Sequence, residues 1–138
     1  MAWRISLRLL VMLALLGLPA YAQEALAPQT QNGVSFVSGG IGEEGRTAMR
    51  QARADYNLHL LFAVQGSGEY LSDVKVKIMD QQGNTLVDAV ADGPFFLAQL
   101  KPGTYQVTAE SGGHARKLSV TIGEKGAVSE SVYWPTGG

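Results

Sequence analysis

The sequence predicts a mainly β protein, an antiparallel sandwich of about seven strands with one amphipathic helix near the N-terminus. Two observations lead to this fold class. Short segments in which apolar and polar residues alternate are separated by turns rich in Gly, Asn and Pro along most of the chain, which is typical of short β-strands. The segments between these strands are also too short for the crossover helices that a parallel sheet requires.

Residues 1–22 have the three parts of a secretory signal peptide. Arg4 and Arg8 form a basic start, Leu9–Leu18 is apolar, and Ala20-Tyr21-Ala22 is a small-x-small cleavage site. A membrane anchor is the alternative interpretation, but the apolar run is shorter than the roughly 20 residues that span a bilayer. We therefore expect cleavage near Ala22, a periplasmic or secreted location, and no stable membrane insertion of the mature chain.

The segment that follows the leader is polar and has no periodicity, so residues 23–32 are expected to form a flexible arm. Residues 33–138 are expected to fold as a single sandwich domain. Within this domain, Gly33–Ser38 is predicted to be a short edge strand, which Gly39-Gly40 ends.

A helix is predicted over residues 42–56, because this segment has no proline and two acidic residues stand in its first turn. An apolar stripe at helical spacing, which we expect to pack on the sheet, consists of Ala48, Met49, Ala52 and Tyr56. At 100° per residue, Arg46, Arg50 and Arg53 lie on the opposite side of the helix. These three residues are called the arginine face below.

The remaining strands are predicted from alternation and from the turns between them. Inward positions are expected for Leu58, Leu60, Phe62 and Val64 in one strand and for Val74, Val76 and Ile78 in a strand over residues 74–79. These two strands are expected to pair across the Gln65–Gly68 loop. A type II turn at Pro102-Gly103 is expected to lead into an alternating strand whose first inward residue is Tyr105. Further strands are predicted over residues 86–91, 95–100, 104–110, 116–122 and 127–134, and the strands at 104–110 and 116–122 are expected to form a hairpin.

Composition and charge exclude some classes of function. The chain has no cysteine, so an exported form would depend on apolar burial rather than on disulfides for its stability. Loss of the leader removes two arginines and makes the mature chain more acidic than the full chain, whose net charge is −1. Because nucleic-acid-binding proteins normally concentrate basic residues on one element, we expect no nucleic-acid partner.

No motif in the sequence indicates catalysis, a metal site or a cofactor. The two histidines, His59 in the strand that begins at Leu58 and His114 at a Gly-Gly turn, stand outside any His-x-x-Glu or His-Glu-x-x-His motif. His59 lies on the strand face opposite Leu58 and Leu60, so it is expected to be a solvent or helix-packing residue. Gly66-Ser67-Gly68 is too short for a nucleophile elbow, and the glycines before the helix lack the Gly-Lys-Ser/Thr of a phosphate-binding loop. We therefore predict that the protein is not an enzyme and has no catalytic residue, metal ligand or cofactor.

The segment Leu100-Lys101-Pro102-Gly103-Thr104-Tyr105-Gln106-Val107 has the pattern Leu-x-Pro-Gly-x-Tyr-x-Val. Together with the turn at residues 80–84 and the segment Gly93–Leu97, it resembles the carboxypeptidase regulatory-like domains, which are small transthyretin-like (prealbumin-like) sandwiches. The resemblance covers roughly Leu58 to Ile122, implies a binding, folding-support or interaction role, and brings no catalytic residues. The similar transthyretin-related hydrolases of urate breakdown end in Tyr-Arg-Gly-Ser, whereas this chain ends in Tyr133-Trp134-Pro135-Thr136-Gly137-Gly138, so their activity is not implied here.

Two functional hypotheses remain. In the first, the protein is an exported, non-catalytic interaction module that docks on another envelope protein through an exposed edge strand or through the arginine face. Arg46, Arg50 and Arg53 are then the candidate partner-binding residues, and a solvated helix face is the alternative interpretation of the same residues.

In the second hypothesis, the protein binds a small ligand such as a carbohydrate through loops at one end of the sandwich, for example Gln65–Tyr70. The aromatic pair near the C-terminus is a further candidate, because an aromatic ring on an outer strand can stack on a sugar or anchor a partner. Trp134, however, shares a strand face with Val132, which favours a core position for Trp134.

Overall fold

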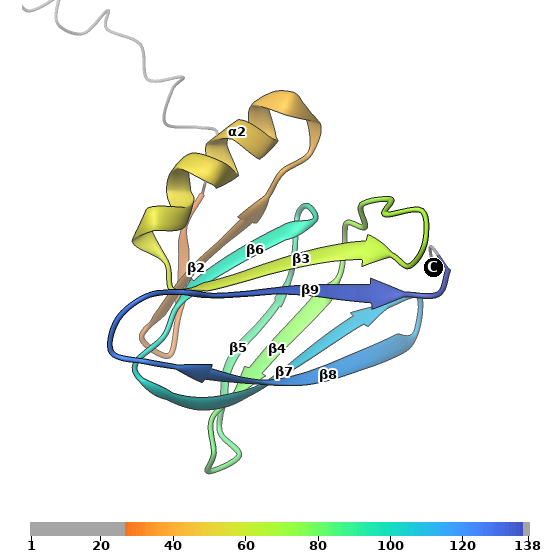
Figure 1. Cartoon of the computed structure of the whole chain (residues 1–138). Helices are drawn as coiled ribbons and strands as arrows, with labels where there is room; N and C mark the ends of the chain where they lie inside the picture. The colour runs from red at the N-terminus through yellow and green to blue at the C-terminus, as the bar shows by residue number, and fades with distance from the viewer. Residues whose placement is uncertain (1–26, 137–138) are drawn as a thin grey trace, which may run out of the picture.

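The computed structural model describes residues 27–136, which form two β-sheets packed face to face with one helix on the outside (Figure 1). The elements are β1 (Gln29–Gln31), β2 (Val34–Gly39), α2 (Gly42–Ala52), the 3-10 turn η2 (Arg53–Asp55), β3 (Leu58–Val64), β4 (Lys75–Met79), β5 (Thr85–Val90), β6 (Phe95–Gln99), β7 (Gly103–Ser111), β8 (His114–Ile122) and β9 (Val128–Trp134). The order is β1-β2-β6-β3-β9 in the five-stranded sheet and β5-β4-β7-β8 in the four-stranded sheet. A mainly β, sandwich-like fold is therefore confirmed, whereas the leader predicted over residues 1–22 lies outside the described residues.

The predicted strand count and the predicted edge strand are wrong. The described part of the chain has nine strands, not about seven. Residues 29–31, which were expected to belong to a flexible arm over 23–32, form β1 and pair with β2. Because β1 lies on its outer side and β6 on its inner side, β2 is an interior strand, although Gly33–Ser38 was predicted at an edge. Pairing with a partner strand orders this polar segment, which lacks any periodicity of its own.

Two pairing predictions are also wrong. β3 and β4 do not pair across the loop at Gln65–Gly68, because they belong to different sheets. The segment that connects them runs along the end of the five-stranded sheet instead. There Tyr70 forms a backbone bridge with Ala63, and the side chain of Leu71 is buried. The sandwich is not wholly antiparallel either, since β9 runs parallel to β3 along the full length of both strands. The chain enters β9 from β8 of the other sheet, at the end where β3 begins, as the hydrogen bond from Val128 N to Asn57 O shows.

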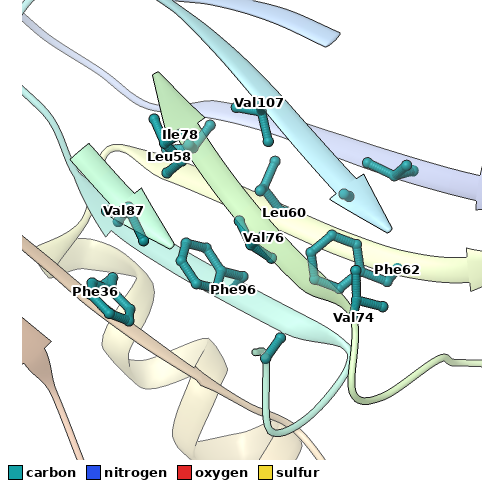
Figure 2. Packing of buried hydrophobic residues seen from close by; sticks show 14 of the residues in the cluster. Phe36, Leu58, Leu60, Phe62, Val74, Val76, Ile78, Val87, Phe96 and Val107 are labelled. Carbon is teal, nitrogen blue, oxygen red and sulfur yellow. The ribbon is translucent and has the colours of Figure 1, made fainter. Parts of the chain in front are cut away.

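The main core lies between the two sheets (Figure 2). Leu58, Leu60 and Phe62 of β3 face Val76 and Ile78 of β4, and all five side chains are at most 1% exposed. This confirms the inward positions predicted from alternation in both strands. Further aromatic packing comes from Phe36 on Phe96, with ring centroids 5.5 Å apart, and from the edge of Phe62 against Trp134 at 6.1 Å.

Tyr105 closes one end of this core. Its ring lies over Gly103, where an added Cβ would meet three of its ring and hydroxyl atoms at 3.7–3.8 Å, and its hydroxyl donates a 2.7 Å hydrogen bond to the carbonyl of Lys101. A tyrosine that bonds back to the backbone just upstream is a corner device of β-sandwiches. Gly103 has a φ of +155°, not the ~+80° of the third residue of a type II turn, so the predicted turn type is wrong.

The helix packs on the outer face of the five-stranded sheet and makes a second, smaller apolar cluster. Met49 is buried there against Val37 of β2 and Leu97 of β6, with Ala52 and Tyr56 beside it. Three of the four residues predicted for the apolar stripe are therefore in this cluster, whereas Ala48 is not. The predicted end of the helix at residue 56 is wrong, because the α-helix ends at Ala52 and the 3-10 turn η2 follows it. Figure 1 shows α2 lying over β2 and β6, so that α2 leaves the outer face of β3 and β9 uncovered.

Within residues 27–136, no helix has the length and apolar character needed to cross a membrane.

Candidate functional site

The uncovered outer face of β3 and β9 carries the largest exposed aromatic side chains of the described residues. Ala63 of β3 is flanked by Tyr133, its partner in β9, and by Tyr70, its partner in an isolated bridge. Partner residues in a sheet point to the same side, so both rings stand on the outer face. Tyr70 is 47% exposed and Tyr133 43%, whereas Ala63 between them is only 2% exposed.

Phe95 and Leu61 extend this row toward the helix. Phe95 of β6 pairs with Leu61 of β3, both are half-buried, and the Phe95 ring meets the ring of Tyr70 edge to face at 5.7 Å. Gly40 makes room for Phe95, because a Cβ at Gly40 would lie 2.3 Å from its ring. The five residues Leu61, Ala63, Tyr70, Phe95 and Tyr133 are called the aromatic surface below.

The structure divides the arginine face. Arg46 is half-buried, while Arg50 and Arg53 are exposed. Arg50 donates to Thr47 Oγ1 on its own helix at 3.1 Å. Arg53 lies in η2, beyond the α-helix, and its guanidinium reaches back to the sheet, where it bonds to His59 and Ser129. Arg53 therefore belongs to the outer face of the five-stranded sheet, and the three arginines do not form one uniform solvent-facing strip.

Arg53, His59 and Ser129 form a polar cluster at the far end of the same uncovered face. Ser129 Oγ lies 3.1 Å from His59 Nδ1, and Arg53 contacts both, with its Nε 3.4 Å from His59 Nδ1 and its Nη2 3.4 Å from Ser129 Oγ. His59 was predicted to be a solvent or helix-packing residue, which fits its half-buried position under η2. Its partner Ser129 carried no signal in the sequence, because the two residues are far apart in the chain and adjacent only through the parallel pairing of β3 and β9.

A hollow with a volume of about 430 Å³ lies at the end of the sandwich beside Tyr105, between the β4–β5 turn and Pro102. The side chain and backbone amides of Asn84 bond to the Asp80 carboxylate and lower the pKa of Asp80 below its ordinary 3.8. Burial, with a smaller contribution from the charge of Asp80, raises the pKa of Tyr105 above its ordinary 10.0. Because these hydrogen bonds hold the turn and the Tyr105 corner in place, we assign both groups to structure.

The sheet edges come together along two sides of the sandwich. On the side called bridged below, the side-chain amide of Gln31 bonds to both backbone groups of Asp88 on β5, at 2.8 and 3.2 Å. Asn32 donates to Leu86 O at 3.0 Å, and Ser38 Oγ accepts from Asp92 N at 2.9 Å. These side chains bond to backbone N–H and C=O groups of β5 and of the residues that follow it. An added strand would need the same groups for pairing.

The opposite side, called open below, is formed by β8 and β9. Among the described residues, one side-chain hydrogen bond joins these two strands: Trp134 Nε1 donates to His114 O at 2.9 Å. Arg116 of β8 pairs with buried Ala109, and Glu130 of β9 pairs with buried Leu60, so both charged residues occupy inward positions at an edge and remain exposed. Inward-pointing charges on edge strands disfavour the addition of another strand.

The described residues contain no group of three or more His, Cys, Asp or Glu side chains arranged to hold a metal ion. A scan against protein-family models finds no match to this chain, and a search of curated proteins also finds none. The resemblance to carboxypeptidase regulatory-like domains therefore stays a prediction.

Proposed function

We propose that the protein is an exported, non-catalytic binding module and that it binds carbohydrate through the aromatic surface. The observation on which this proposal rests is the row Tyr70, Ala63 and Tyr133, in which two exposed rings flank one small buried residue. The C–H face of a sugar ring is apolar and packs on an aromatic ring, while the tyrosine hydroxyl stays available to water and to sugar hydroxyls. Export is supported by the leader pattern of residues 1–22.

The dimensions and surroundings of the row also suit an oligosaccharide. Tyr70 and Tyr133 lie on either side of β3, so their backbones are separated by two strand spacings, about 9.5 Å. Exposed polar residues come close to the row in the chain: Ser131 is two positions before Tyr133 on β9, and Gln65 and Ser67 belong to the loop before Tyr70. These groups provide hydrogen-bond donors and acceptors for sugar hydroxyls.

Docking on another envelope protein has weaker support from the same structure. The free edges of β8 and β9 carry the inward charges Arg116 and Glu130, which disfavour strand addition. The arginine face is divided, because Arg53 is bonded to the sheet and Arg46 is half-buried. The part of the second hypothesis that places the loop Gln65–Tyr70 in the site is favoured, since this loop ends in one of the two exposed rings.

Affinity electrophoresis would test the proposal. The chain is expressed in full and run through gels that contain neutral or acidic soluble polysaccharides. We expect at least one polysaccharide to retard the wild type. Tyr133→Ala and Tyr70→Ala should each weaken binding at least tenfold, which corresponds to about 1.4 kcal/mol of binding free energy. Val90→Ala is a matched control, because Val90 is a 53% exposed apolar residue on the other sheet.

The proposal is overturned if no polysaccharide retards the wild type, or if both tyrosine variants bind as the wild type does. A crosslinked protein partner that is lost in Tyr133→Ala, without any sugar binding, would instead favour the interaction module.

A further inference from the structure

The polar cluster of Arg53, His59 and Ser129 has the arrangement of a site for an anionic group. The ring of His59 is held by two backbone carbonyls, because its Nε2 lies 2.9 Å from the carbonyl oxygen of Tyr56 and 3.1 Å from that of Arg53. A ring nitrogen that faces two carbonyl oxygens carries the hydrogen, so Nδ1 of the neutral ring is the acceptor. His59 therefore presents a fixed acceptor to Ser129 and Arg53 and acts as a positioning residue for the guanidinium.

The guanidinium of Arg53 donates its hydrogen bonds to uncharged side chains. The two side chains to which it donates, His59 and Ser129, offer a ring nitrogen and a hydroxyl, both at 3.4 Å. Such long bonds are weak, and they use two of the five N–H donors of a guanidinium. The planar fork of an arginine matches a carboxylate with two parallel hydrogen bonds. Arg53 is thus oriented by the sheet and retains donors for a ligand.

A cleft of about 480 Å³ opens beside this cluster, between η2, the start of β3 and the segment before β9. Arg53 and His59 line it together with the exposed side chain of Gln99. Of the described residues that line the cleft, Glu124 is the one with a negative charge. The cleft therefore has space and donors for an anionic group, and Glu124 is the group that would oppose it.

This cleft and the aromatic surface lie on the same uncovered strip of the sheet. In the β3–β9 ladder, His59 pairs with Ser129, Leu61 with Ser131, and Ala63 with Tyr133. All six are outward positions, because the alternate residues of β3 are buried in the main core. The last pair lies four residue steps from the first, which corresponds to about 13 Å along the strands. A chain of several sugar rings can cover this distance, whereas one ring cannot.

We propose that the ligand of this surface is an acidic oligosaccharide, which stacks on Tyr70 and Tyr133 and places a sugar carboxylate on Arg53. This inference rests on the carbohydrate-binding function proposed above and adds the class of sugar and the residue that selects it. The aromatic row supplies contact with the rings, and Arg53, positioned by His59 and Ser129, distinguishes charged from neutral chains.

Isothermal titration of the chain, expressed in full, with an oligogalacturonate and with the same oligosaccharide after reduction of its carboxyl groups would test the inference. The two ligands have the same rings and differ in charge. We expect the wild type to bind the carboxylated form at least tenfold more tightly. This preference should shrink as the salt concentration rises, because an exposed ion pair is screened.

Three substitutions separate Arg53 from a general charge effect. Arg53→Gln should weaken binding of the carboxylated ligand at least tenfold and leave the reduced ligand within threefold of the wild type. Arg50→Gln is the matched control, since Arg50 is an exposed arginine of the neighbouring helix that bonds to Thr47 and not to the sheet, and it should change neither affinity more than threefold. Glu124→Gln should strengthen binding of the carboxylated ligand.

The outcomes distinguish the two proposals. If both ligands bind equally and only the tyrosine variants weaken them, the carbohydrate-binding function stands and the inference about Arg53 is wrong. Equal losses in Arg53→Gln and Arg50→Gln would mean unspecific charge attraction and would also overturn the inference. If neither this pair nor any polysaccharide of the earlier test binds to the wild type, both proposals fail.

Discussion

The bridged and open sides of the sandwich protect their sheet edges in different ways. On the bridged side, Gln31 and Asn32 form hydrogen bonds with the edge of β5, as a neighbouring strand would. On the open side, Arg116 and Glu130 occupy inward positions at the edges of β8 and β9. The first device ties the two sheets together, whereas the second only discourages pairing with another chain. The open side therefore keeps β9 unpaired along its free edge, and β9 is the strand that carries Tyr133 and Ser129 of the proposed site.

The largest effect is expected at Trp134, which links the two strands of the open side. Trp134 is 2% exposed, packs on Phe62 and donates to His114 O. Trp134→Ala should lower the free energy of unfolding by about 3–5 kcal/mol, because it removes a large buried ring. Trp134→Phe keeps a ring and loses the N–H, so it should cost about 1 kcal/mol for the hydrogen bond in addition to the lost volume. Urea denaturation measures both values, and equal losses in the two variants would show that the hydrogen bond outweighs the packing.

A smaller effect is expected on the bridged side. Gln31→Ala removes two hydrogen bonds to the backbone of Asp88, which is exposed and can bond to water instead. We expect a loss of about 1 kcal/mol in the free energy of unfolding and faster hydrogen exchange at the Asp88 amide. Gln29→Ala is the control, since Gln29 is an exposed glutamine of the same strand. If exchange at Asp88 is unchanged in Gln31→Ala, the amide bridge does not protect β5.

The smallest change in stability is expected when the inward charges of the open side are replaced. Arg116→Val together with Glu130→Val should alter the free energy of unfolding by less than about 0.5 kcal/mol, as is usual for exposed positions. The same variant should self-associate more than the wild type in sedimentation velocity at equal concentration, because its two free edges no longer carry an inward-pointing charge. Lys117→Val, an outward position on β8, should sediment as the wild type does. Unchanged sedimentation of the double variant would refute the protective role of Arg116 and Glu130.

Local patterns predicted much of the fold. The inward residues of β3, β4 and β7, the position of the helix and the burial of Trp134 follow from alternation or helical spacing within a few residues. Tyr133 could be assigned to the outside by the same reasoning. What failed was the choice of partners: β3 does not pair with β4, β2 is not at an edge, and β1 is a strand although its sequence has no strand signal.

The candidate site depends on those partner choices. For this protein, the amino-acid sequence is sufficient to determine on which face of its strand Ala63 or His59 lies, because alternation is a property of each strand alone. Only the tertiary structure places Tyr70 and Tyr133 on either side of Ala63, and Ser129 beside His59. The physical reason is that strand pairing is decided by how all the apolar faces close into one core, and a parallel neighbour such as β9 arrives through a connection from the other sheet, which no local pattern encodes.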